Sequence, residues 1–188
     1  MDLVEKWQSG DINAFEALFQ QYYELVFKTA YFMVGNKQEA EDVLQEVFIA
    51  MWKSRCTFDP AKGKLTTWLH RITINKCISG HRKKQAAFFS LEETRDRGFD
   101  LLETKSSELP EELLMSKWEY ERMMKALGSL EGKHRSTVIL RYFNDLSYDE
   151  IAQVLGIPLG TVKSRLNQAI RTLRRELEKE KQEYGGAG

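Results

Sequence analysis

The apolar residues of this chain recur at intervals of three and four positions, and no stretch alternates apolar and polar residues as a strand does. Between Asp11 and Gly35 this series consists of Phe15, Leu18, Phe19, Tyr22, Val26 and Ala30. Such spacing places apolar side chains on one side of a helix, which then packs against other helices. The sequence therefore predicts an all-α fold.

Capping residues and glycines divide this pattern into separate helices. We expect helices over 11–35, 36–53, 66–80, 110–128, 132–143, 147–156 and 159–179. Several starts are residues suited to the cap or first turn of a helix, namely Asp11, Asn36, Thr66 or Thr67, Pro110 and Ser147. Glycines suit the ends, at Gly35, Gly80, Gly128 and Gly156.

Charge is unevenly distributed along the chain, although the net charge is zero. Residues 86–112 carry 3 basic and 8 acidic side chains and only scattered apolar ones, which is typical of a linker. We expect two small helical domains, 1–85 and 111–180, joined by a flexible or partly helical linker over 86–110 and able to move independently. Residues 181–188 form a disordered tail in this interpretation.

Several functional classes are excluded by composition. Cys56 and Cys77 are too few for a disulfide framework, and they form no CxxC pair. The three histidines share no metal-ligand spacing, and the chain has no glycine-rich phosphate loop or nucleophile motif. A secretory signal and a membrane-spanning stretch are also lacking. We expect a cytoplasmic protein with no cofactor, no small-molecule substrate, no membrane insertion and no catalytic residues.

Two basic segments, 60–91 and 160–175, contain no acidic residue. Two such segments on a neutral chain favour two contacts with a polyanion, since phosphate neutralisation by Lys and Arg releases counterions. In the first segment, aromatic and aliphatic residues alternate with cations, which suits unstacked single-stranded bases. Trp68 fits a core position equally well.

The second basic segment lies in a pattern typical of a helix-turn-helix. Residues 146–173 read LSYDEIAQVLGIPLGTVKSRLNQAIRTL, with Ala152 small enough for a helix contact and Gly156 suited to the turn. The second helix directs apolar residues inward, namely Val162, Leu166, Ala169, Ile170 and Leu173. Its opposite side has no acid and carries polar groups that suit base edges and phosphates better than a plain amphipathic hairpin would.

Three blocks in order carry a family resemblance: EAEDVLQEVFIAMW (39–52), FDPAKGKLTTWLHRITIN (58–75) and LSYDEIAQVLGIPLGTVKSRL (146–166). Together they closely resemble bacterial RNA polymerase sigma factors of the extracytoplasmic-function group. In that family the first domain binds polymerase and opens the −10 promoter element, and the second reads the −35 element as duplex. The resemblance implies a sigma factor that directs promoter-specific transcription initiation.

The resemblance also implies roles for individual residues. An acidic face that would otherwise be a solvated helix surface docks on the polymerase β′ clamp helices through Asp42, Gln45, Glu46 and Phe48. The −10 element contacts Phe58, Lys62, Lys64, Leu65, Trp68, Arg71 and Asn75, with Lys76, Arg82 and Lys83 on phosphates. The −35 element contacts Thr161, Lys163, Ser164, Arg165, Asn167, Gln168, Arg171 and Arg175. Asn167 and Gln168 stand where the family often has a basic residue.

The implied partners are core RNA polymerase, through its β′ clamp helices and β flap, promoter DNA, and an anti-sigma protein. One alternative from another class stays open at this point. The chain could be a stand-alone helix-turn-helix regulator with a helical sensor domain, in which case the acidic face of the first domain is ordinary surface.

Overall fold

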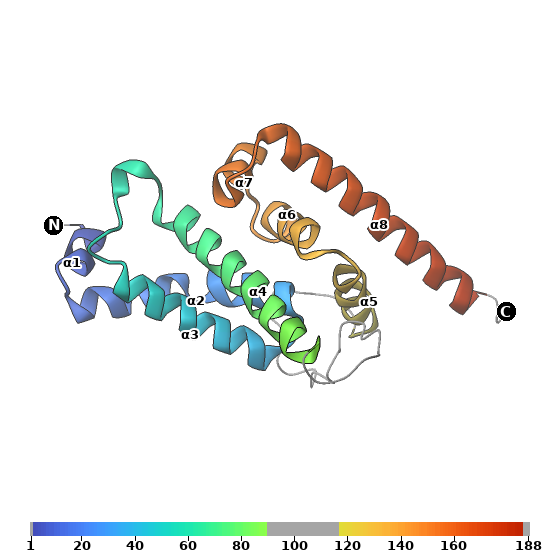
Figure 1. Cartoon of the computed structure of the whole chain (residues 1–188), viewed down its shortest axis with the longest axis horizontal. Helices are drawn as coiled ribbons and strands as arrows, with labels where there is room; N and C mark the ends of the chain where they lie inside the picture. The colour runs from blue at the N-terminus through green and yellow to red at the C-terminus, as the bar shows by residue number, and fades with distance from the viewer. Residues whose placement is uncertain (1, 90–116, 186–188) are drawn as a thin grey trace.

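The computed structural model describes residues 2–89 and 117–185, with side chains placed in 2–80 and 117–179. Every regular element of these residues is helical, which confirms the predicted all-α class (Figure 1). The elements are α1 (Leu3–Gln8), α2 (Ile12–Val34), α3 (Lys37–Lys53), the 3-10 turn η1 (Pro60–Lys62), α4 (Leu65–Phe89), α5 (Lys117–Gly128), α6 (Gly132–Tyr142), α7 (Tyr148–Leu155) and α8 (Leu159–Gly185).

Local capping sets several helix ends where the sequence predicts them. The Asp11 carboxylate accepts main-chain hydrogen bonds at the start of α2, and Ser147 and Glu150 form a capping box at the start of α7. These helices end at glycines in the left-handed region, Gly35 with φ 87° and Gly156 with φ 64°. A side chain is strained in that conformation, so glycine stops both helices there.

The boundaries predicted for α4 are wrong at both ends. The helix begins at Leu65 rather than after a Thr66 or Thr67 cap, and it continues through Gly80 to Phe89. A glycine inside a helix costs only about 1 kcal/mol relative to alanine. Gly80 therefore does not end a helix whose neighbours favour continuation.

Other differences lie at the ends of the chain. The sequence pattern does not predict α1, whose Asp2 and Glu5 form a capping box. Its Trp7 is fully buried, with its ring centroid 5.8 Å from that of Phe58. At the other end, α8 runs to Gly185 instead of ending near residue 179. The predicted helix start at 110, most of the 86–110 linker and the last three tail residues lie outside the described residues.

A first hydrophobic core is formed within α1–α4 and the loop before α4. Its buried members are Trp7, Ala14, Leu18, Val26, Leu44, Val47, Phe48, Met51, Phe58, Leu65 and Leu69. These positions follow the helical spacing seen in the sequence, so each helix contributes one apolar side. The core fixes α3 and α4 side by side and thereby positions the first domain's candidate surfaces.

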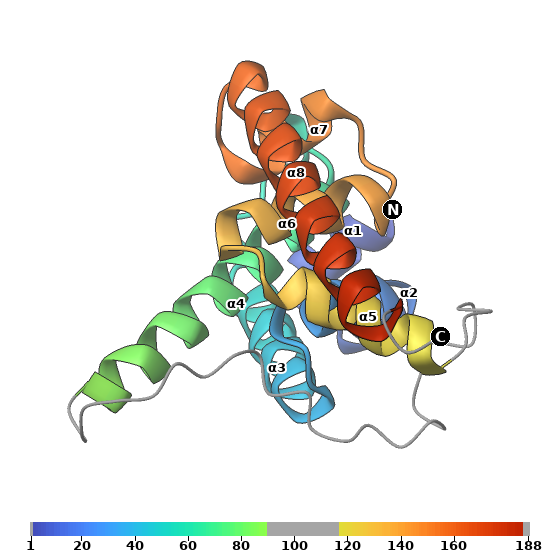
Figure 2. The same ribbon diagram turned by 90° about the vertical axis from the view of Figure 1, so that its right-hand side faces the viewer.

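A second core joins the two predicted domains. The C-terminal part of α2 contributes buried residues such as Tyr31 and Phe32, which pack together with α5, α6 and α8 residues such as Met124, Ile139 and Leu166. Figure 2 shows α8 crossing over α5 and α6, with α2 behind α5. The expectation of two independently moving domains therefore does not describe this conformation, because an apolar core spans both.

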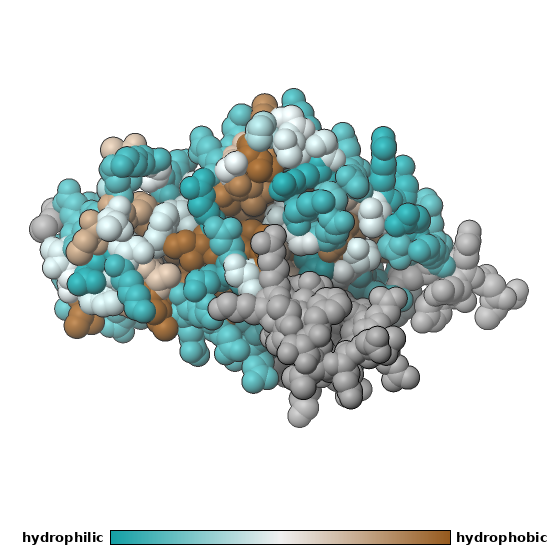
Figure 3. Space-filling view, viewed as in Figure 1, coloured by the Kyte–Doolittle hydropathy of each residue, from teal (hydrophilic) through white to brown (hydrophobic). Residues whose placement is uncertain are grey.

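Because each helix turns its apolar side toward a core, mainly polar side chains remain on the surface. Figure 3 shows a mostly hydrophilic face on which hydrophobic residues gather over α7 and the start of α4. Within the described residues, none of the helices combines the length and apolar character needed to span a bilayer.

Candidate nucleic-acid interface

The acidic face of the first domain lies on α3. Asp42, Gln45 and Glu46 are all exposed on it, and Ile49, one helical turn further on, is 53% exposed. An exposed isoleucine among acids forms an apolar centre with a charged rim, which is the usual composition of a protein-binding patch. The sequence analysis did not single out Ile49. It follows Asp42 by seven residues, Gln45 by four and Glu46 by three, so helical spacing places it on the same face.

The docking role implied for Phe48 does not fit this structure. Phe48 is 4% exposed and its ring centroid lies 4.5 Å from that of Phe19. Its position one residue from the acidic face rotates it by about 100° into the core. Phe48 therefore supports α3 from behind, and Ile49 replaces it on the surface.

The acidic face is linked to the basic helix beside it. Lys76 on α4 donates a hydrogen bond to Glu46 on α3, with its Nζ 2.8 Å from Oε2. The Lys76 side chain is 39% exposed, so solvent screens the pair and its contribution to stability is small. The Lys76 ammonium group therefore lies where the acidic face of α3 meets the basic surface of α4.

The loop before α4 separates into buried and exposed residues. Phe58 is 9% exposed and makes an edge contact with Trp68, with centroids 5.7 Å apart. Leu65 is 7% exposed and lies in the first core. The DNA contacts implied for Phe58 and Leu65 therefore do not fit this conformation, because core packing already uses both side chains. Trp68 is half-buried, which agrees with the two roles considered for it.

Four polar residues of this block reach the surface, namely Lys62, Lys64, Arg71 and Asn75. Asp59 begins η1 by accepting a hydrogen bond from the Ala61 N–H, and it pairs with Lys62 at 3.4 Å. The side chains of Arg82 and Lys83 lie outside the described residues. The structure thus brings together a loop and the first three turns of α4 as one basic surface.

The second domain covers part of that basic surface. The Arg71 guanidinium donates to the main-chain carbonyls of Val154 (Nε, 3.0 Å) and Gln153 (Nη2, 2.5 Å) at the end of α7. Lys64 lies 3.9 Å from Glu150, also on α7. A cleft of about 1150 Å³ remains between the loop and the α7 turn, lined by groups that include Trp68 and Pro158.

The helix-turn-helix carries the other candidate surface. On α8, Val162, Leu166 and Ala169 are buried. The opposite side is exposed at Lys163, Ser164, Asn167, Gln168, Arg171 and Arg175, with Thr161 and Arg165 half-buried. Ile170 was expected to point inward but is 37% exposed, so it lies at the edge of this surface.

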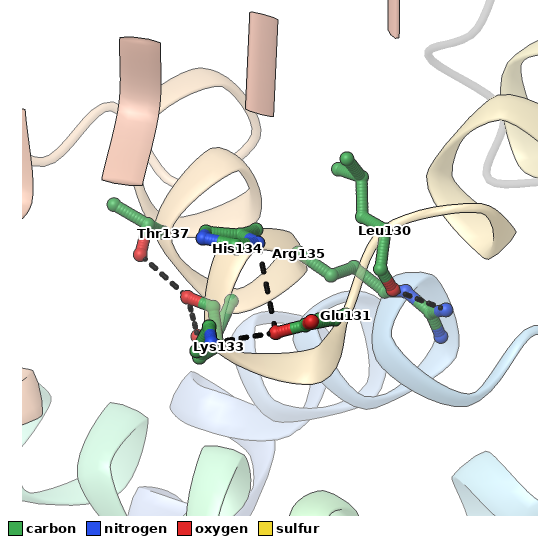
Figure 4. Close-up of polar contacts among 7 residues, drawn as sticks. Leu130, Glu131, Lys133, His134, Arg135 and Thr137 are labelled. Atoms are coloured by element: carbon green, nitrogen blue, oxygen red, sulfur yellow. Dashed lines mark hydrogen bonds and ion pairs between the residues drawn. The ribbon is translucent and has the colours of Figure 1, made fainter. Parts of the chain in front are cut away.

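A buried polar cluster at the start of α6 fastens that helix to the end of α5 and to α2, and the sequence pattern does not reveal it (Figure 4). Arg135 is 8% exposed and donates to the carbonyls of Leu127, Gly128 and Leu130 around the end of α5 and to that of Met33 in α2. Burial lowers the pKa of the Arg135 guanidinium to about 10, so it stays charged near neutral pH. Beside it, Glu131 pairs with Lys133 at 2.7 Å.

The Cys77 thiol is buried in the second core. Burial raises the pKa of the Cys77 thiol to about 12, so the thiol stays protonated and unreactive. Within the described ranges, no three His, Cys, Asp or Glu residues are grouped so that they could hold a metal ion.

Comparison with known proteins shows the family to which the two parts of the chain belong. The family profile described as "Sigma-70 region 2" matches residues 18–87, and that described as "Sigma-70, region 4" matches residues 120–173. The ECF RNA polymerase sigma factor SigW of Bacillus subtilis is 32% identical over 177 residues, which cover 93% of this chain and 94% of that protein. The chain belongs to the extracytoplasmic-function (ECF) sigma factors of the sigma-70 family. It therefore directs promoter recognition by RNA polymerase through regions 2 and 4, and sigma factors are not enzymes.

Solved sigma factors share the fold. CnrH, in complex with the cytosolic domain of CnrY, has a TM-score of 0.68 at 24% identity, covering 94% of this chain and 95% of that chain. RpoE of Bartonella quintana, in complex with the anti-sigma factor NepR, has a TM-score of 0.72 at 22% identity, covering 89% of this chain and 98% of that chain. The predicted family, fold class and general function are thus confirmed. The alternative of a regulator with a sensor domain is not supported, because the first domain matches region 2.

Proposed function

We propose that this sigma factor holds core polymerase through α3, captures the opened −10 element with α4 and its preceding loop, and reads the −35 element as duplex with α8. The observation that carries the proposal is the composition of α8. Its buried side fixes the helix on the domain, and its exposed side from Gly160 to Arg175 contains basic and amide groups but no acid. A major groove accepts such a helix.

The polymerase-binding surface is proposed as Asp42, Gln45 and Glu46 around Ile49, with the β′ clamp helices as the partner. The acidic groups favour a basic partner and speed encounter, while the exposed Ile49 supplies apolar burial. Region 4 would contact the β flap. Holding both regions on one polymerase raises the effective concentration of each DNA-binding surface at the promoter.

The −10 surface is proposed as Lys62, Lys64, Trp68, Arg71 and Asn75, with Lys76, Arg82 and Lys83 on phosphates. Trp68 offers an aromatic face at the edge of the first core, and the cations around it neutralise phosphates. Capture of unstacked bases offsets an unstacking cost of a few kcal/mol per base, so binding favours strand opening.

The −35 surface is proposed as Thr161, Lys163, Ser164, Arg165, Asn167, Gln168, Arg171 and Arg175. Arginines can bind guanine bidentately and Asn or Gln can bind adenine, each such contact contributing about 1–3 kcal/mol of discrimination. The Ser164 hydroxyl donates to the Thr161 carbonyl in this conformation and must rotate to contact DNA.

Reconstituted transcription tests the proposal. Core polymerase is combined with the purified chain on a random promoter library, and the enriched templates report the two elements. Asp42→Arg should abolish binding to core polymerase and transcription, because it places a cation on the acidic face. Glu16→Arg, on an exposed α2 position, is the matched control and should leave both unchanged. Unaltered polymerase binding by Asp42→Arg would overturn the assignment of α3.

An anti-sigma protein is the remaining proposed partner, and the cytoplasm, where polymerase works, is the proposed location. Two of the similar structures are complexes, CnrH with the cytosolic domain of CnrY and RpoE with NepR, which supports such a partner here. The test is co-purification of a tagged chain from its own organism without inducing stress. A chain recovered only with core polymerase under all conditions would contradict the proposal.

A further inference from the structure

The short helix α1 precedes the residues that match the region 2 profile, which begin at residue 18. Figure 1 shows α1 beside the segment that leads from α3 into η1. The capping box of Asp2 and Glu5 fixes the start of the helix, and its fully buried Trp7 belongs to the first core. Helix α1 is therefore docked on region 2, next to the loop that precedes α4.

Gln8, the last residue of α1, holds the main chain of that loop. Its side-chain amide donates to the Phe58 carbonyl, with Nε2 and the oxygen 2.6 Å apart, although the two residues are 50 positions apart in the chain. The Phe58 N–H donates to the Ser54 carbonyl within the loop. Both main-chain polar groups of Phe58 are therefore bonded, and one of these bonds comes from α1.

The ring of Phe58 connects α1 to the start of α4. Its centroid lies 5.8 Å from that of Trp7 and 5.7 Å from that of Trp68, and both pairs have the inclined geometry that aromatic rings favour. Trp7 and Phe58 are at most 9% exposed, whereas Trp68 is half-buried. The three rings thus form a continuous contact from α1 to the side chain proposed to face unstacked bases.

The turn after Phe58 carries cations of the −10 surface and is bonded mainly to itself. In the part of the chain that the structure describes, the hydrogen bonds and the ion pair of residues 59–63 stay within the turn, where Asp59 caps η1 and pairs with Lys62. The orientation of this turn on region 2 therefore depends on the residues at its two ends. These are Phe58 and Leu65, which both lie in the first core.

We infer that Gln8 and Trp7 are positioning residues of the −10 surface, because α1 holds Phe58 by its carbonyl and by its ring and thereby sets how η1 and Trp68 face the opened strand. The inference rests on the proposed −10 function of α4 and its preceding loop. Without these contacts the loop can adopt several orientations. Ordering it on DNA then costs conformational entropy, which lowers affinity for the strand.

Binding of the opened strand by the reconstituted holoenzyme tests the inference. The probe is a fluorescent single strand that carries the −10 sequence enriched from the promoter library, and anisotropy measures its affinity. Gln8→Leu removes the amide donor but keeps a side chain of similar size, so we expect strand binding to weaken about three- to tenfold. Gln20→Leu, the same change at an exposed position of α2, is the matched control and should bind as the wild type does.

Two further measurements separate positioning from a loss of stability. Gln8→Leu should keep wild-type affinity for core polymerase and for a −35 duplex, since neither proposed surface includes the loop. On the promoter library it should accept a broader set of −10 sequences with an unchanged −35 preference. Weaker binding to core polymerase with an unchanged −10 preference would show a purely structural role and would overturn the inference.

The ring contact is tested by two changes at Trp7. The indole Nε1 has no hydrogen-bond partner among the described residues, so Trp7→Phe loses no hydrogen bond and keeps an aromatic ring against Phe58. Trp7→Leu removes that ring. With helix content checked by circular dichroism, Trp7→Leu should bind the −10 strand at least about threefold more weakly than Trp7→Phe. Equal affinities would overturn the role of the ring.

The outcomes distinguish this inference from the proposed function. If the wild-type holoenzyme does not bind the −10 strand, the proposed −10 function fails. If the wild type binds it, and Gln8→Leu binds it equally well with the same −10 preference, the positioning role of α1 is wrong while the −10 function stands.

Discussion

The two helices proposed to contact DNA differ in how much of their working surface is accessible. On α8, six of the eight proposed contact residues are exposed and lie on its outer side. On α4, Arg71 is bound to α7 carbonyls and the adjacent Trp68 lines a cleft closed from the other side by the α7 turn. The packing of region 4 on region 2 therefore leaves the side proposed to read duplex accessible, while it covers part of the side proposed to capture the opened strand.

The largest expected effect comes from removing the support of the α8 surface. Leu166→Ala should lower the free energy of unfolding by about 2–5 kcal/mol, because Leu166 is 2% exposed and its loss leaves a cavity. Urea denaturation measures it. Ile170→Ala, at the exposed edge, should cost less than about 1 kcal/mol. Equal losses would show that α8 is not oriented as described.

Arg135→Met should loosen the packing that covers α4. Four carbonyls lose a charged donor, and we expect the free energy of unfolding to fall by about 3 kcal/mol. Thermal denaturation with calorimetry measures the loss. Lys133→Met, an exposed cation two residues earlier, is the control and should change stability by less than about 0.5 kcal/mol. A wild-type melting temperature for Arg135→Met would contradict the role of Arg135 at the interface.

Acid should weaken the same packing through His70. Burial lowers the pKa of this imidazole to about 4, with Glu150 opposing the shift, and its Nδ1 has no hydrogen-bond partner. In the unfolded chain His70 therefore becomes protonated as the pH falls below about 6.5. In the folded chain it becomes protonated only near pH 4. Stability present above pH 6.5 is lost as the pH falls through this window, by up to about 3 kcal/mol.

The measurement for His70 is the slope of unfolding free energy against pH between 6.5 and 4. His70→Leu should flatten that slope relative to wild type, since the replacement cannot bind a proton. An unchanged slope would assign the acid sensitivity to other groups.

The smallest expected effect compares the two arginines directly. Arg171→Ala should weaken binding of the free chain to a −35 duplex at low salt by about 1–3 kcal/mol. Arg71→Ala should change it by less than about 0.5 kcal/mol, since Arg71 does not face that duplex. Fluorescence anisotropy measures both. If Arg71→Ala weakened duplex binding as much as Arg171→Ala does, the proposal that α8 and not α4 contacts the −35 duplex would be contradicted.

Features set by neighbouring residues could be predicted from the sequence. Asp11, Gly35, Ser147 and Gly156 begin or end their helices through bonds or backbone angles within a few residues, so the chain itself carries the signal. The exposed side of α8 follows equally from the helical period. The boundaries of both domains and the roles of individual residues stay predictions.

Contacts between distant residues could not be predicted in this way. Arg71 binds carbonyls 82 and 83 residues away, and Arg135 binds one 102 residues away. Every residue has the same main-chain carbonyl, so no pattern of residue types in the sequence indicates which carbonyls Arg71 and Arg135 will bind. Phe48 illustrates a different limit, because it borders both the acidic and the apolar side of α3 and only packing decides between them.

The most direct test of the packing of region 4 on region 2 is energy transfer between a dye at Cys56, which is exposed in region 2, and a dye at Asp149→Cys on α7. Both positions adjoin residues that line the same cleft, and the buried Cys77 stays unlabelled. The account predicts high transfer in the free chain and low transfer in the transcribing complex with core polymerase. Low transfer in the free chain, or high transfer retained in the active complex, would contradict it.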